Sequence, residues 1–176
     1  MKKTNVKKLT LTAIFVAVSV VGSMFSFPVG SAKCAPIQHL MNIMGAVFLG
    51  PGWTVAAAFA ASVLRNLMGL GSLMAFPGSM CGALLAGLLY RWFKNLPLTY
   101  LGEVFGTGII GGLLAYPVAK LLMGVDAAAF AYIVPFLIST VGGTVIAAVL
   151  VTALKKSGVV DRLLEEDSGA GSVEMR

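Results

Sequence analysis

The sequence predicts an all-α membrane protein built as a bundle of six transmembrane helices, and its composition is the first reason. Hydrophobic residues make up 58% of the 176 residues and charged residues only 11%, with a mean hydropathy of +0.92. A soluble domain has roughly 45–50% apolar and about 25% charged residues. Because too few polar side chains remain to cover a water-soluble surface, lipid is the expected solvent, and an ordinary cytosolic enzyme is excluded.

The first apolar run covers residues 9–25 and follows a basic segment, residues 1–8, that contains four lysines. A spanning helix needs about 20 apolar residues, whereas the apolar core of a signal peptide has about 7–15. The run is therefore predicted to be an uncleaved first transmembrane helix, which ends before Phe27-Pro28.

The second and third helices are separated by turn-forming residues. Residues 38–49 form a short run that Gly50-Pro51-Gly52 ends, so this helix either begins inside the preceding loop or spans the membrane incompletely. Residues 53–68 form the third run. A loop marked by Gly and Pro is predicted at residues 69–77.

The remaining helices complete the predicted transmembrane domain, which covers residues 9–156. Residues 78–93 form the fourth helix, 101–123 the fifth and 130–154 the sixth. Residues 157–176 carry five of the seven acidic residues and show no apolar period. This acidic tail is predicted to be partly disordered and cytoplasmic.

The basic residues predict the orientation of the chain in the membrane. Six spans place both termini on one side, and ten of the thirteen Lys and Arg residues fall on that side, against Lys33, Arg65 and Lys120 on the other. Because cytoplasmic segments carry an excess of Lys and Arg, both termini are predicted to be cytoplasmic. The basic residues punctuate apolar runs and form no patch, so no nucleic-acid partner is expected.

Motifs for nucleotide binding and for metal-dependent catalysis are missing from the sequence. It contains no GxxxxGK[ST] motif, its one histidine is His39, and its two cysteines fit no zinc-binding spacing. We therefore expect no metal, no cofactor and no enzymatic activity, with a small membrane enzyme or an assembly factor as the alternative. Uphill transport by this chain would take its energy from a partner or an ion.

Polar residues within membrane segments are costly and mark functional sites, and here they gather toward the side opposite the termini. His39 and Asn42 are three residues apart and share a face of their helix. Asn42 offers both a donor and an acceptor to a small polar ligand. The candidate substrate-binding residues are Gln38, His39, Asn42, Arg65, Asn66, Ser72, Phe76, Ser79, Tyr116 and Tyr132.

Structural roles are the alternative for these residues. Tyr116 and Tyr132 fit an interfacial aromatic belt, and Arg65 fits a helix end that holds the following loop. Glu103, near the cytoplasmic start of the fifth helix, is expected to face the membrane interface or a partner and not the substrate.

Three stretches of the chain resemble the substrate-binding S components of energy-coupling factor (ECF) vitamin transporters, most closely the ThiW-like S components. The resemblance covers about residues 5–156. The stretches are Leu9-Thr-Leu-Thr-Ala13-x3-Ala17, then Cys34-Ala-Pro-Ile-Gln-His39-Leu-Met-Asn42 with Leu49-Gly-Pro51, and residues 64–87, which include Leu64-Arg65-Asn66 and Phe76-Pro77-Gly78-Ser79.

The resemblance implies a six-helix bundle in the cell membrane that captures a thiamine precursor, the thiazole alcohol hydroxyethylthiazole. It also implies a transmembrane coupling subunit, which would dock at Ala13 and Ala17, and a pair of ATPases as partners. Another water-soluble vitamin such as thiamine is the alternative ligand. The near absence of acids from the outer half, where Asp126 is the exception, argues against such a cation. Phe76 or Tyr132 could stack on the ring, beneath a lid formed by residues 28–36.

Overall fold

The computed structural model describes residues 3–30, 32–126 and 128–158, so nearly all of the predicted acidic tail lies outside the described residues. Helices make up most of the described chain, together with one short antiparallel hairpin. The elements in chain order are α1 (Lys3–Gly22), η1 (Ser23–Phe25), β1 (Phe27–Val29), β2 (Ala32–Cys34), α2 (Pro36–Phe48), α3 (Pro51–Leu67), α4 (Ala75–Phe93), α5 (Leu96–Glu103), η2 (Val104–Gly111), α6 (Gly112–Leu122) and α7 (Ile133–Lys156).

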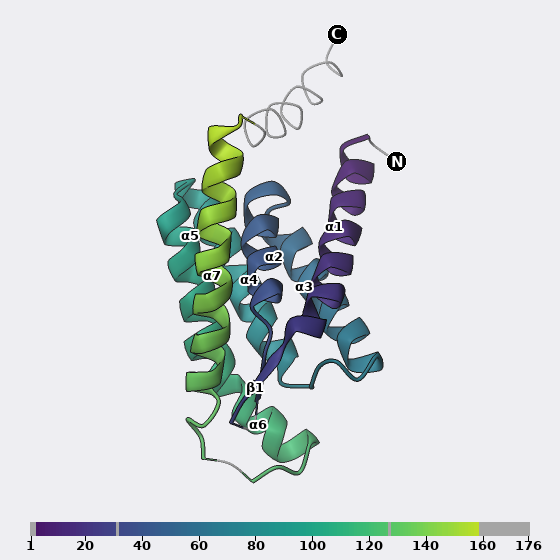
Figure 1. Cartoon of the computed structure of the whole chain (residues 1–176), viewed down its shortest axis with the longest axis vertical. Helices are drawn as coiled ribbons and strands as arrows, with labels where there is room; N and C mark the ends of the chain where they lie inside the picture. The colour runs from purple at the N-terminus through teal and green to yellow at the C-terminus, as the bar shows by residue number, and fades with distance from the viewer. Residues whose placement is uncertain (1–2, 31, 127, 159–176) are drawn as a thin grey trace.

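The helices lie side by side with their axes roughly along the long axis of the molecule (Figure 1). The beginning of α1 and the end of α7 lie at the same end of the bundle, and the β1–β2 hairpin and α6 lie at the opposite end (Figure 1). We call this second end the hairpin end. Helix α2 is central, because ten of its 13 residues are buried and it packs against α1, α3, α4 and α7.

Among the described residues, three helical stretches are long and apolar enough to cross a membrane, Val6–Phe25, Leu96–Leu122 and Ile133–Lys156. Helices α2, α3 and α4 are 13, 17 and 19 residues long. The structure therefore agrees with an all-α membrane protein. The shortness predicted for the second helix is also observed.

The link between the first two helices is an ordered hairpin. Phe27 pairs with Cys34 and Val29 with Ala32, and Gly30 at the turn has a positive φ of 58°, which a glycine adopts without steric cost. Burial raises the pKa of the Cys34 thiol, which donates a hydrogen bond to the carbonyl oxygen of Pro135 at 3.1 Å. This contact holds the hairpin against α7.

The predicted fifth helix begins earlier than expected and changes its winding midway. Asn95 caps it by accepting a hydrogen bond from the Leu98 amide at 3.2 Å, so the helix begins at Leu96 and not at residue 101. The central segment η2 is a π-helix, a form that often occurs at functional sites. It packs closely on α4 because glycines meet there: a Cβ on Gly111 would lie 2.5 Å from Cα of Gly78.

Candidate functional site

A buried carboxylate lies at the centre of the bundle. Glu103 ends α5, and none of its surface is exposed. Its Oε1 atom is 2.9 Å from His39 Nδ1 and accepts hydrogen bonds from Asn42 Nδ2 at 3.0 Å and from Thr107 Oγ1 at 3.1 Å. The expectation that Glu103 faces the membrane interface or a partner is therefore wrong. Because the helix begins at Leu96, Glu103 lies two turns inside it and faces α2 and α4.

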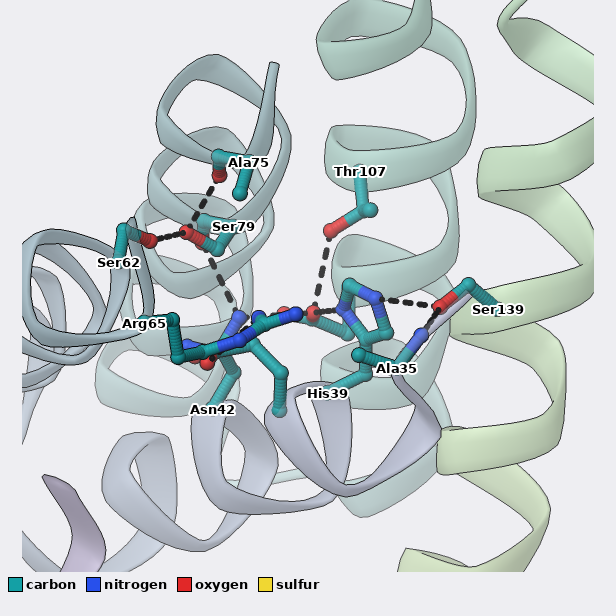
Figure 2. Close-up of polar contacts among 11 residues, drawn as sticks. Ala35, His39, Asn42, Ser62, Arg65, Ala75, Ser79, Thr107 and Ser139 are labelled. Carbon is teal, nitrogen blue, oxygen red and sulfur yellow. Dashed lines mark hydrogen bonds and ion pairs between the residues drawn. The ribbon is translucent and has the colours of Figure 1, made fainter. Parts of the chain in front are cut away.

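His39 connects this carboxylate to α7. Its Nε2 atom lies 3.1 Å from Ser139 Oγ, which also accepts a hydrogen bond from the backbone amide of Ala35 at 2.8 Å. Figure 2 shows the contact of the imidazole with Ser139. When the carboxylate is ionised it only accepts, so His39 donates from Nδ1. The shared face predicted for His39 and Asn42 is observed, since both side chains reach Glu103.

A second group of polar contacts joins α2, α3 and α4. Arg65 Nη1 donates to Gln38 Oε1 at 3.3 Å, and the hydroxyl oxygens of Ser62 and Ser79 are 3.0 Å apart. Asn42 Nδ2 also donates to the Ser79 carbonyl oxygen at 3.0 Å, which links this group to Glu103. Apart from the Arg65–Gln38 pair, these contacts join polar side chains from α2, α3, α4, α5, η2 and α7 into one network inside an apolar bundle (Figure 2).

A small cavity borders the network. Its volume is about 40 Å³, enough for a few water molecules, so a ring-sized ligand requires the lining to move apart. Five of the predicted binding residues line the cavity: Gln38, His39, Arg65, Ser72 and Ser79. The rest of its wall is formed by Ala32, Lys33, Ala35, Gly71, Ala75, Gly78, Thr107, Phe136 and Ser139.

Two of the other predicted residues do not line the cavity but form hydrogen bonds with residues around it. Asn42 is hydrogen-bonded to Glu103 and to the backbone of Ser79. Asn66 Nδ2 donates to the carbonyl oxygens of Ser62 at 2.8 Å and Ser72 at 3.1 Å, which braces the loop after α3.

Three predicted aromatic residues lie away from the cavity wall. The ring of Phe76 packs against Phe59, with centroids 5.6 Å apart. Tyr116 accepts a long hydrogen bond from Lys120 at 3.5 Å. Tyr132 is fully buried in an apolar cluster. The aromatic ring that does line the cavity belongs to Phe136, a residue that the sequence did not single out.

Sequence reasoning also missed Glu103 and Thr107 as members of the site. One signal was available: Glu103 and Asp126 are the two acids between residues 9 and 153, and an acid within a membrane segment is functional by default. Thr107 follows Glu103 by four residues, which places it one turn further along the same helix face.

Gly82 on α4 makes room for this network. A Cβ at position 82 would overlap Thr107 Oγ1 and lie 2.7 Å from Glu103 Oε2. We expect Gly82→Ala to lower the free energy of unfolding by about 1–3 kcal/mol, because the collision displaces buried hydrogen-bonded groups. Chemical or thermal unfolding of the purified protein measures this.

Gly142→Ala is the matched control, since a Cβ there would be 3.7 Å from its nearest neighbour, Pro36 Cγ. Alanine is favoured over glycine within a helix by about 0.5–1 kcal/mol, so this control should be neutral or stabilising. Equal stability of the two variants would contradict the close packing at Gly82.

Comparison with known proteins agrees with this picture of a membrane protein with an internal polar site. Residues 9–157 match the family described as "Thiamine-precursor transporter protein (ThiW)". The chain is also 39% identical over 121 residues to the thiamine precursor transporter HmpT of Lactococcus lactis subsp. cremoris (strain MG1363), a match that covers 65% of this chain and 72% of that protein. No solved structure matches the chain. The chain therefore belongs to the ThiW family of thiamine-precursor transporter proteins.

Proposed function

We propose that this chain is the substrate-capture subunit, or S component, of an ECF-type ABC transporter that takes up hydroxyethylthiazole. The observation that carries the proposal is the cavity beside a buried polar network, inside a chain of the ThiW family. The curated relative is named a thiamine precursor transporter, which supports a precursor of this size. Ser72 offers its hydroxyl to the ring nitrogen or the hydroxyl of such a ligand, and His39 and Ser139 could bind it by giving up their contact with each other.

The hairpin end is the proposed entrance. Ala32 and Lys33 of β2 line the cavity, and the Cys34 contact to Pro135 holds this strand in place. Because the cavity is too small for a ring as it stands, binding requires the hairpin or the loop after α3 to move outward. The hairpin would thus act as the lid predicted for residues 28–36.

A cationic ligand such as thiamine is the second candidate, and the position of Glu103 alters the argument against it. An acid lies beside the cavity after all. Its Oε1 atom is occupied by His39, Asn42 and Thr107. Its Oε2 atom has no partner among the described residues, but no Asp or Glu is among the residues that line the cavity. The neutral thiazole alcohol remains the better fit than a cation.

The partners of the proposed transporter are a transmembrane coupling subunit and a pair of cytoplasmic ATPases. The sequence has no P-loop of its own, so ATP hydrolysis belongs to another subunit. Ala13 and Ala17 lie on the exposed side of α1 together with Ile14 and Val18. Small side chains on an exposed helix face permit close approach of a partner helix, which supports docking there.

The test of this function combines binding with copurification. The purified chain should gain thermal stability with hydroxyethylthiazole, by about 2.7 kcal/mol at a ligand concentration of 100 Kd, and less with thiamine at equal concentration. Affinity purification from its own membranes should bring down ATPase subunits. Turnover of the thiazole by the isolated chain would instead indicate an enzyme.

The proposed topology has six spans with both termini in the cytoplasm. Helices α1, α2, α3 and α4, the continuous stretch Leu96–Leu122 and α7 would be the spans. The beginning of α1 and the end of α7 share one end of the bundle (Figure 1), and the sequence predicts ten of the thirteen basic residues on that side. A reporter fused after Arg176 should be active only in its cytoplasmic form, and an external signal would contradict the six spans.

A further inference from the structure

Arg65 is a buried cation without an ionic partner. Only 3% of its surface is exposed, and its one side-chain hydrogen bond in the described chain runs to the neutral amide oxygen of Gln38. Its Nε atom is buried and has no partner among the described residues. The Glu103 carboxylate contacts His39 through Oε1, its Oε2 atom has no partner among the described residues, and no ion pair joins it to this guanidinium in the described part of the chain.

Arg65 lines the cavity, and the charged side chains that line it directly are basic, whereas the Glu103 carboxylate lies behind the wall against His39 and Thr107. Lys33 at the exposed edge and Arg65 inside are both lining residues, together with His39, and no acidic side chain of the described chain joins them. Figure 2 shows the long Arg65 side chain reaching from α3 toward the centre of the polar network. The wall therefore carries basic side chains, and the Nε–H group of Arg65 is a buried donor without a partner among the described residues.

A guanidinium taken out of water is costly unless an anion accepts its hydrogen bonds. Carboxylates and phosphates match the guanidinium fork with two parallel hydrogen bonds. A neutral hydroxyl provides one oxygen and no opposite charge. An oxyanion on the ligand therefore compensates Arg65 better than the hydroxyl of the thiazole alcohol does.

We infer that the cavity binds a ligand that carries an oxyanion, a phosphate monoester or a carboxylate, and that Arg65 is its anchor. The inference rests on the proposed capture of a thiazole precursor and specifies the charge of the preferred substrate. The ring would lie toward Phe136, and the oxyanion would face Arg65, with Ser72 as a further donor from the loop after α3.

Calorimetry on the full chain in detergent compares three probes that share one ring: hydroxyethylthiazole, its phosphate monoester and the corresponding thiazole acetic acid. Inorganic phosphate and acetate are two probes without a ring. We expect at least one of the two ring anions to bind about tenfold or more tightly than the alcohol. The stronger of the two anions identifies whether phosphate or carboxylate is the natural group.

Arg65→Met should abolish this preference, so that the variant binds neither ring anion more tightly than the alcohol. The variant is expected to fold, because the change removes an unpaired buried charge. Arg65→Lys keeps the charge without the fork and should show an intermediate preference. Arg91→Met is the matched control: Arg91 is exposed on α4 and does not line this cavity, so the preference should persist.

An alcohol that binds as tightly as both anions to the wild type overturns the inference and leaves the proposed function standing, and this comparison needs no variant. Binding of inorganic phosphate or acetate in the wild type but not in Arg65→Met, without binding of any thiazole, supports the anion site and contradicts the proposed function. No binding of any probe overturns both.

Discussion

Replacing Glu103 by alanine is expected to lower the free energy of unfolding by about 3–5 kcal/mol, the range observed when one partner of a buried polar or ionic pair is removed. The substitution leaves His39 Nδ1 and Thr107 Oγ1 without their acceptor, and it removes one of the two acceptors of Asn42 Nδ2, which keeps the Ser79 carbonyl oxygen. A buried donor without a partner costs about 1–3 kcal/mol. Thermal or denaturant unfolding in detergent measures the loss, and ligand binding should weaken with it because His39 lines the cavity.

Two variants make this measurement specific. Glu103→Gln keeps the shape and one acceptor oxygen, so its loss of stability should be smaller than that of Glu103→Ala. Asp126→Ala removes an acid that is exposed on the loop after α6, and its stability should remain within about 0.5 kcal/mol of the wild type. If Glu103→Ala unfolds at the same temperature as Asp126→Ala, the carboxylate does not hold the network together.

The double variant Ala13→Trp with Ala17→Trp is expected to abolish transport while the isolated protein still binds its ligand. Both alanines are exposed on α1, so two indole rings there would not disturb the interior of the bundle. They would prevent the close helix approach that small residues permit. Uptake of labelled precursor by cells and calorimetry on the purified variant measure the two properties separately.

Val145→Trp with Val149→Trp is the matched control. These valines have the same four-residue spacing, and 59% and 70% of their surfaces are exposed on α7. Transport should persist in this variant. Loss of both transport and binding in the α1 variant would show that Ala13 and Ala17 serve the fold, and full transport would remove them from the docking surface.

Several features of the protein depend only on its overall composition and on the helical repeat, and these were predictable from the sequence. The membrane as solvent follows from composition, which is a total over all residues. The shared face of His39 and Asn42 follows from the helical repeat, which holds wherever the helix is placed. Arg65, Ser72 and Ser79 were identified as polar residues in apolar surroundings, and all three line the cavity.

The position of Glu103 depended on two facts that no periodicity contains. The first is the start of its helix at Leu96, which the Asn95 cap sets. The second is the rotation of that helix about its axis. The close contact between the glycines of η2 and α4 sets this rotation, and with it the direction of the polar face. A helix that began at residue 101 would place Glu103 in its first turn, where a carboxylate commonly faces solvent or headgroups.

The sequence by itself determined the solvent, the family and the polar residues available for a site. Only the tertiary structure decided which of them meet, because the contacts that build the site join residues far apart in the chain: His39 with Glu103, 64 positions away, and Ala35 with Ser139, 104 positions away. The tertiary structure also decided which aromatic side chain lines the cavity. Phe136 lines the cavity while Tyr132, one turn earlier on the chain, is buried in apolar packing, since the rotation of α7 against its neighbours sets which ring faces the cavity.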